Sequence, residues 1–274
     1  MSDGTRNAWQ RFWEAGGWWR PFLLGVVYLA IYLGIGQLTG RVFAGAIDTA
    51  NPTGSAPSIL LGVMLPILLG GIALLIFVRS LGWTRAVFGP QSVRGAGWMW
   101  IAVLVVVIPI LLRLLATDWS AYSAPVLWSL LALGLCVGFT EELLARGAVV
   151  TMLRRGGSSE RTIMLVSSAV FSLLHAGNLF SGQDPLTVGV TVVYAFGFGA
   201  MMYLVLRVTG TLIWPMLLHT ATDPTTILAV GGIDSHGSST GDSALLGIAG
   251  IFNFVYIAFA IIAVFLVKGR APRE

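Results

Sequence analysis

Ionisable side chains lie inside three long apolar stretches of this sequence. Each stretch contains one pair of residues four apart, which share a face of a helix. The pairs are Glu142 and Arg146, Phe171 and His175, and His219 and Asp223, and Glu141 directly precedes the first pair. A charge at the bilayer centre costs about 2.5 to 3.5 kcal/mol even on the lenient insertion scale, so each charged group needs a partner or a function. Carboxylates and imidazoles are the usual general bases and oxyanion donors of hydrolysis. The three sets therefore predict one chemically active site.

The depth of these residues supports a common site. Counted from the nearest loop arginine, Glu141, His175 and His219 lie 13, 14 and 12 residues inside their apolar stretches. At about 1.5 Å per residue, all three are roughly 18 to 21 Å from the same membrane surface, near the bilayer midplane. Polar groups at one depth on three helices are expected to face a common cavity.

Spacing within each helix divides the residues by role. Glu142 and Arg146 are expected to form an ion pair, because residues four apart face each other on a helix. Glu141 lies about 100° away round the same helix and is the glutamate expected to take part in chemistry. Phe171 lies one turn before His175 and is expected to pack against its ring.

The third set, His219 and Asp223, projects from one face of its helix. Pro224 follows directly, and it is expected to distort the helix beside the site because it lacks a backbone donor. Arg113 differs from these residues. It lies near the end of an apolar stretch, close to Asp118, and we expect it to extend toward the membrane interface.

The composition shows what kind of protein carries these residues. Of the 274 residues, 56% are hydrophobic and 10% are charged, and the mean hydropathy is +0.85. Too few polar side chains exist to cover the surface of a water-soluble protein, so the protein is expected to lie in a lipid bilayer. The formal charge of +4 comes from loop arginines and does not indicate nucleic-acid binding. The single cysteine, Cys136, excludes an intramolecular disulfide.

Eight apolar segments are long enough to cross a bilayer, which takes about 20 residues. They lie at about 21–39, 58–78, 97–116, 124–153, 162–181, 187–206, 210–230 and 244–267. The predicted fold is an all-α polytopic membrane protein with about eight transmembrane helices and an active site in a mid-membrane cavity. Residues 1–20 are expected to form a cytoplasmic interfacial segment, 21–267 a single transmembrane domain, and 268–274 a cytoplasmic tail.

The loops on the two sides of the membrane differ in charge. One side carries Arg6, Arg11, Arg20, Arg79, Arg85, Arg94, Arg154, Arg155, Arg161, Arg207, Lys268, Arg270 and Arg273, and the other carries Arg41, Asp48, Asp118, Asp184, Asp234 and Asp242. By the positive-inside rule, both termini are cytoplasmic. We expect an integral protein of a bacterial inner membrane.

Other residues are expected to serve packing or the surface. Trp9, Phe12 and Trp13 predict the apolar face of a short surface helix. Glycines in the first two spans are expected to permit close helix packing, and they are Gly34, Gly36, Gly70 and Gly71. His236, in a loop rich in Gly and Ser, is expected to be solvated.

The elements Glu141-Glu142-x-x-x-Arg146, Phe171-x-x-x-His175 and His219-x-x-x-Asp223, in this order, resemble the CAAX-protease and bacteriocin-processing family of intramembrane proteases. This family includes type II CAAX prenyl endopeptidase-like and Abi proteins. The resemblance covers roughly residues 120–230, the protease core of the family. Each spacing is common alone, whereas all three in order and at one depth are specific.

The resemblance implies a role for each residue. Glu141 and His175 would activate the hydrolytic water, and His219 and the residue at position 223 would bind the oxyanion. Family members commonly have asparagine at the last position, where this chain has Asp223. An oxyanion-binding role for Asp223 therefore requires a protonated carboxyl; otherwise Asp223 orients His219 or supports a metal.

The types of the site residues are compatible with either a zinc-dependent or a metal-free mechanism. Glu141, His175 and His219 form a set of two histidines and one carboxylate, the kind that holds catalytic zinc with an open position. The compact HExxH pair is absent from the sequence, which slightly favours a metal-free glutamate mechanism without any cofactor.

The predicted function is that of an intramembrane endopeptidase acting on a peptide or membrane-protein substrate. A non-catalytic membrane partner or immunity-type protein of the same fold is the main alternative, although such a protein would have lost site residues that are all present here. A proton-coupled transporter would show two related halves, and no internal repeat is visible. Nothing outside the core indicates the substrate, its prenylation or an oligomeric state.

Overall fold

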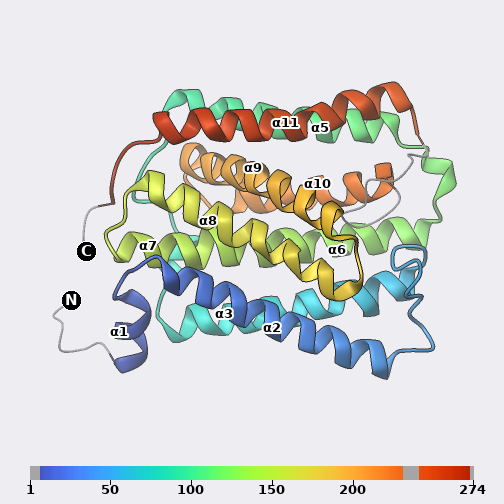
Figure 1. The fold of residues 1–274 in the computed structure, drawn as a ribbon, viewed down its shortest axis with the longest axis horizontal. Helices are drawn as coiled ribbons and strands as arrows, with labels where there is room; N and C mark the ends of the chain where they lie inside the picture. Colours follow the sequence, from blue (N-terminus) through green and yellow to red (C-terminus); the bar gives the residue numbers. More distant parts are fainter. Residues whose placement is uncertain (1–6, 231–240, 272–274) are drawn as a thin grey trace.

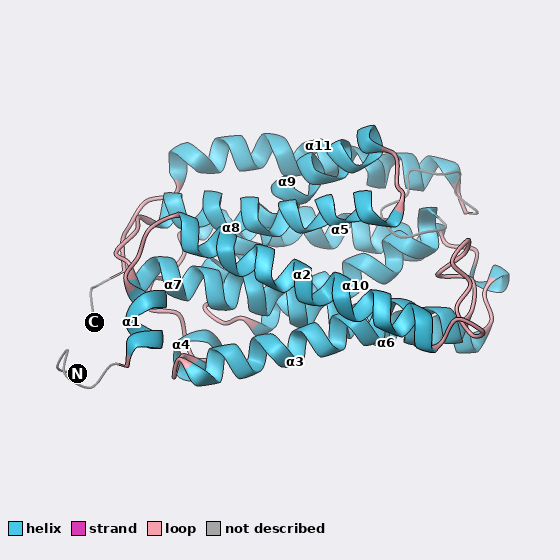
Figure 2. Cartoon of the chain, turned by 60° about the horizontal axis from the view of Figure 1, so that its bottom comes forward, coloured by secondary structure: helices cyan, strands magenta, loops and turns pink. Residues whose placement is uncertain are grey.

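The computed structural model describes residues 7–230 and 241–271. Predictions for Arg6, Asp234, His236 and Arg273 fall outside the described residues. Long helices lie side by side along the longest axis of the molecule, and the connecting loops gather at its two ends (Figures 1 and 2). The all-α prediction is confirmed.

The helices follow the apolar segments closely. Their bounds are α1 (Ala8–Glu14), α2 (Trp19–Val42), α3 (Leu65–Ser80, preceded by a π-helix at Ser58–Met64), α4 (Thr84–Phe88), α5 (Trp100–Ala116, preceded by a 3₁₀ turn at Gly97–Met99), α6 (Ala124–Glu142), a π-helix at Leu143–Val149, α7 (Val150–Arg155), α8 (Glu160–Leu174), a 3₁₀ helix at His175–Ser181, α9 (Pro185–Thr209), α10 (Ile213–Val230) and α11 (Ser243–Leu266); a further 3₁₀ turn spans Trp119–Ala121.

In the described part of the chain, seven helical segments are long and apolar enough to cross a membrane. The eighth long helix, α10, has 18 residues. It is less apolar than the others because it carries His219, Asp223 and several threonines. The prediction of about eight transmembrane helices is consistent with this arrangement. Pro224 lies inside α10, which continues through it to Val230.

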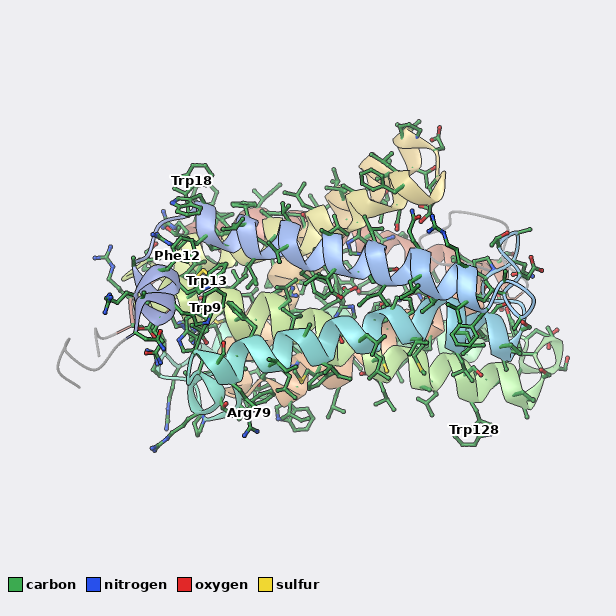
Figure 3. All side chains as sticks on the ribbon, turned by 90° about the horizontal axis from the view of Figure 1, so that it is seen from below. Trp9, Phe12, Trp13, Trp18, Arg79 and Trp128 are labelled. Carbon is green, nitrogen blue, oxygen red and sulfur yellow. The ribbon has the colours of Figure 1, made fainter. Side chains whose placement is uncertain are left out.

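Tryptophans mark the two ends of the bundle. Trp9, Trp18 and α1 lie at one end and Trp128 at the other, and the Trp18 and Trp128 side chains point outward (Figure 3). Trp18 is 69% exposed and Trp128 is 70% exposed. Tryptophan is enriched at membrane–water interfaces, so these rings match the two edges of a bilayer. The C-terminal end of α11 lies at the same end as α1 (Figure 1).

The short helix predicted near the N-terminus is present as α1, with one correction. The Asn7 side chain caps it by accepting a hydrogen bond from the backbone N–H of Gln10 at 2.9 Å. Trp9 and Phe12 are exposed, whereas Trp13 is buried. The Trp13 ring packs edge-on against Phe77 of α3, with centroids 5.0 Å apart. Trp13 therefore fixes α1 to the bundle instead of sharing an exposed apolar face.

Glycines set how closely some helices approach. A Cβ built on Gly70 would meet the Tyr28 ring at 3.0 Å, and one on Gly71 would meet Thr140, so both glycines permit close packing as predicted. The prediction is wrong for Gly34, where a Cβ would meet nothing within 4 Å, because this face of α2 is not covered. Gly36 would make only an ordinary contact, with Pro66.

The crossing of α6 and α10 depends on a glycine pair that the sequence analysis did not single out. A Cβ on Gly134 would lie 2.7 Å from the Thr220 carbonyl oxygen, and one on Gly138 would lie 2.6 Å from the Met216 carbonyl oxygen. Backbone atoms cannot move aside as a flexible side chain can. The spacing Gly134-x-x-x-Gly138 is the small-residue pattern that lets membrane helices approach closely. The signal was thus available in the sequence.

Two arginines predicted to lie in loops, Arg154 and Arg207, are only 10% and 3% exposed and bind one carboxylate at one end of the bundle. Glu160, fully buried at the start of α8, accepts hydrogen bonds from Arg154 Nε and Nη2, each at 2.9 Å, and from Arg207 Nη1 at 3.1 Å. The Tyr203 hydroxyl also donates to Glu160. This network joins α7, α8 and α9 and holds the helices that carry the predicted site.

Candidate active site

A cavity of about 480 Å³ lies within the bundle. Its lining includes Glu141 of α6, Phe171 of α8, His175 immediately after α8, and His219 and Asp223 of α10. The structure therefore brings the four predicted catalytic residues and Phe171 to one cavity. The sequence predicted a common cavity from the equal depth of these residues in the membrane and from the helix faces on which they lie.

Glu142 and Arg146 lie beside this cavity in the protein interior. Their ion pair measures 3.0 Å from Nη1 to Oε1, and neither side chain is exposed. Arg146 Nη2 also donates to the Gly199 carbonyl of α9 at 2.7 Å, and the guanidinium carbon lies 4.6 Å from the centre of the Phe171 ring. The pair spans the start of the π-helix at Leu143–Val149, a local geometry often found at functional sites. Arg146 thus connects α6, α8 and α9.

Both ring nitrogens of His219 lie close to carboxylates. Its Nδ1 atom lies 2.8 Å from Glu142 Oε1. A carboxylate paired with an arginine is an acceptor, so Nδ1 carries the proton and donates. Its Nε2 atom lies 3.9 Å from Glu141 Oε2 and 3.5 Å from Asp223 Oδ1. The Nε2 atom of His219 therefore lies near both carboxylates that line the cavity.

Aromatic rings enclose the imidazoles. Phe171 packs edge-on against His175, with centroids 5.3 Å apart, and against His219 at 5.6 Å. Phe198 of α9 packs against the His219 ring at 5.1 Å. These rings restrict the orientation of both histidines and exclude water from that side of the site. Phe198 had no sequence signal, because an aromatic residue in an apolar helix is unremarkable.

Glu141 is oriented differently from Glu142, its neighbour in sequence. The Glu141 side chain is 20% exposed, into the cavity, whereas that of Glu142 has no exposed area. Tyr28 of α2 also lines the cavity and is within electrostatic range of Glu141. The two glutamates thus differ in their surroundings: Glu141 faces the cavity, and Glu142 contacts His219 and Arg146.

The predicted zinc set does not fit this arrangement. Within residues 7–230 and 241–271, no group of three or more His, Cys, Asp or Glu side chains is placed to hold a metal ion. Glu141, His175 and His219 line the same cavity, but their side chains are not grouped as the ligands of one ion.

One prediction about a nearby cation is corrected. Arg113 was expected to extend to the membrane interface, but its side chain is buried, 7% exposed, and lines the cavity. The reason is that α5 packs between α10 and α11, so the end of α5 is covered by the bundle and does not face lipid.

Residues 123–225 match the family model described as type II CAAX prenyl endopeptidase Rce1-like. The matched segment is the one in which the three motifs lie, and it is similar to the family that they resemble. The Rce1-like segment contains all seven predicted site residues and runs from α6 into α10. No curated protein and no solved structure matches the chain. The protein is an integral membrane protein with an Rce1-like core, and helices outside that core, α2, α3 with the π-helix before it, α5 and α11, also line the cavity.

Proposed function

We propose that this protein is an intramembrane endopeptidase in which Glu141 and His175 activate the hydrolytic water. The observation that carries the proposal is the placement of Glu141, His175, His219 and Asp223 on one cavity within the helical bundle. A peptidase-family match over the same residues supports it. The protein would lie in a bacterial inner membrane with both termini in the cytoplasm, as the loop charges indicate.

The first chemical step is attack of water on a peptide carbonyl. Glu141, which faces the cavity, accepts a proton from the water, while His175 holds the water oxygen by a hydrogen bond. The oxygen forms a bond to the carbonyl carbon, and the carbonyl oxygen takes up the negative charge. Glu141 then transfers its proton to the leaving nitrogen as the carbon–nitrogen bond breaks. The products are a carboxylic acid and an amine.

His219 stabilises the oxyanion. Because its Nδ1–H donates to Glu142, its Nε2 can donate to the oxyanion only from the protonated ring. Glu142 on one side and Asp223 on the other favour this positive charge. Asp223 thus acts through His219, which accounts for an aspartate at this position without requiring it to carry a proton. A preorganised donor in a buried site is typically the largest contribution to hydrolysis.

The test is hydrolysis by purified protein in detergent, against a mixed library of peptides and membrane-protein segments. Wild type, Glu141→Gln and His175→Ala are compared, each with and without a chelator. Loss of a general base is expected to lower the rate by about 10²- to 10⁴-fold. Asp118→Asn, a carboxylate change in an exposed loop, is the matched control and should retain the wild-type rate. The chelator should have no effect. Cleavage by Glu141→Gln at the wild-type rate would refute the proposal.

A further inference from the structure

A second pair of polar residues lines the same cavity, from helices outside the Rce1-like segment. Arg113 is on α5 and Tyr256 is on α11, two helices that pack against each other. Both side chains are buried, Arg113 at 7% and Tyr256 at 3% exposed. Each lies within electrostatic range of the other.

Both groups lack a hydrogen-bond partner at a buried atom. Among the described residues, nothing accepts from Arg113 Nη1, and nothing bonds to the Tyr256 hydroxyl. Asp223 is within electrostatic range of Arg113, but its ion-pair contact is with His219. A guanidinium has five donors and no acceptor, and a phenol has one donor. Buried donors normally have a hydrogen-bond acceptor. Because Arg113 and Tyr256 line the same cavity and each has a buried donor without one, we expect a ligand that accepts hydrogen bonds from both.

We propose that Arg113 and Tyr256 form a subsite for a carboxylate of the bound peptide; this inference rests on the proposed peptidase function. A carboxylate offers two coplanar oxygens, which match the parallel N–H groups of a guanidinium, and the tyrosine hydroxyl adds a third donor. A single negative charge suits the site better than a doubly charged phosphate, because Asp223 and Glu141 line the same cavity.

The carboxylate has two possible sources on a peptide: the C-terminus or an aspartate or glutamate side chain. In either case, one end of the peptide is held at Arg113 while a carbonyl is presented to Glu141 in the same cavity. The position of the carboxylate then determines which peptide bond is cut.

Binding to the Glu141→Gln protein tests the subsite without requiring hydrolysis. The probes are apolar N-acetylated peptides of four to eight residues, each made with a C-terminal acid and with a C-terminal amide. A second series keeps the amide terminus and carries Asp or Asn at one position. Affinity is measured by titration in detergent, and thermal unfolding confirms that each variant is folded.

We expect the carboxylate member of one series to bind about tenfold or more tightly than its neutral partner. The series that shows this preference identifies the source. Adding Arg113→Gln should remove the preference, Arg113→Lys should retain part of it, and Tyr256→Phe, which removes one oxygen atom, should reduce it. Arg85→Gln, at an exposed arginine, should leave it unchanged.

Two results would overturn the subsite. One is equal affinity for the acid and neutral members of both series. The other is a preference that persists in both Arg113→Gln and Tyr256→Phe. The outcome is separable from that of the hydrolysis test. An Arg113-dependent preference without cleavage by wild type would keep the subsite and reject the peptidase, whereas cleavage without any preference would reject the subsite alone.

Discussion

The Nδ1 atom of His219 lies 2.8 Å from Oε1 of Glu142; the Glu142 side chain has no exposed area, and that of His219 is 2% exposed. The same oxygen accepts from Arg146 at 3.0 Å. Glu142 therefore compensates a buried cation and orients an imidazole on a neighbouring helix. This relationship distinguishes Glu142, which contacts Arg146 and His219, from Glu141, which faces the cavity.

Replacing Glu142 should affect stability and hydrolysis together. Glu142→Ala leaves Arg146 buried without a counter-charge, and such a change typically costs about 3 to 5 kcal/mol. Glu142→Gln keeps an oxygen for His219 but loses the charge, so it should be less destabilised and still slower than wild type. Thermal unfolding in detergent and the peptide assay measure the two effects. For stability the matched control is Glu141→Ala, because the Glu141 side chain faces the cavity. Equal unfolding midpoints for Glu142→Ala and Glu141→Ala would contradict the buried ion pair.

The sequence predicted contacts within a helix better than contacts between helices. The Glu142–Arg146 pair followed from a four-residue spacing, and the spans followed from the length of apolar runs, since both depend only on local geometry. The Glu142–His219 bond depends on how α6 and α10 are rotated about their axes. That rotation is set by packing of Gly138 against Thr220; the Gly134-x-x-x-Gly138 spacing indicates close packing of α6 but does not show which helix packs there.

Charge patterns were misleading where a buried partner was distant in sequence. Arg207 was assigned to a loop because it follows an apolar run, yet it is 3% exposed and bonds to Glu160, 47 residues away. Arg113 was assigned to the interface for the same reason. In both cases the partner or the covering helix comes from elsewhere in the chain, so the local sequence could not show the burial.

The close approach of α6 and α10 predicts that Gly138→Ala disrupts the site. The added methyl group would lie 2.6 Å from the Met216 carbonyl oxygen, so α10 must shift, and His219 lies one turn beyond Met216. We expect a lower unfolding midpoint and a loss of hydrolysis of at least about tenfold, because a displacement of about 1 Å can cost 10²-fold in rate. Gly34→Ala is the matched control, since a Cβ there meets nothing within 4 Å. Equal behaviour of the two variants would show that the helices do not approach as described.

The position of Asp223 predicts different results for two substitutions. Asp223 Oδ1 lies 3.5 Å from His219 Nε2. Asp223→Asn keeps an oxygen at this place, so hydrolysis should remain within about tenfold of wild type. Asp223→Ala removes the contact, and the rate should fall by about 10²-fold, the lower range for one oxyanion-stabilising interaction. Steady-state hydrolysis rates of Asp223→Asn, Asp223→Ala and wild type test this expectation. A rate for Asp223→Ala equal to that of wild type would exclude a role through His219.

The network around Glu160 predicts a variant that loses stability without a direct effect on chemistry. Glu160→Ala leaves Arg154 and Arg207 without their shared carboxylate, and we expect a loss of about 3 to 5 kcal/mol. Arg161→Ala, the next residue and exposed, should change stability by no more than about 0.5 kcal/mol. Thermal unfolding in detergent compares the two. Any Glu160→Ala protein that stays folded at the assay temperature should hydrolyse peptide at nearly the wild-type rate.

The proposed membrane orientation predicts which loops are reached from outside the cell. Cys136 is the chain's single cysteine, so a Cys136→Ser protein provides a background for labelling. Ser120→Cys, in the exposed loop between α5 and α6, should react with a membrane-impermeant maleimide in intact cells. Arg85→Cys, in exposed α4 near the opposite end, should react only after the cells are opened. The positive-inside rule assigns the arginine-rich loops to the cytoplasm, which is the basis of this expectation. Labelling of Arg85→Cys but not Ser120→Cys in intact cells would invert the topology and, with it, the side from which a peptide reaches the cavity.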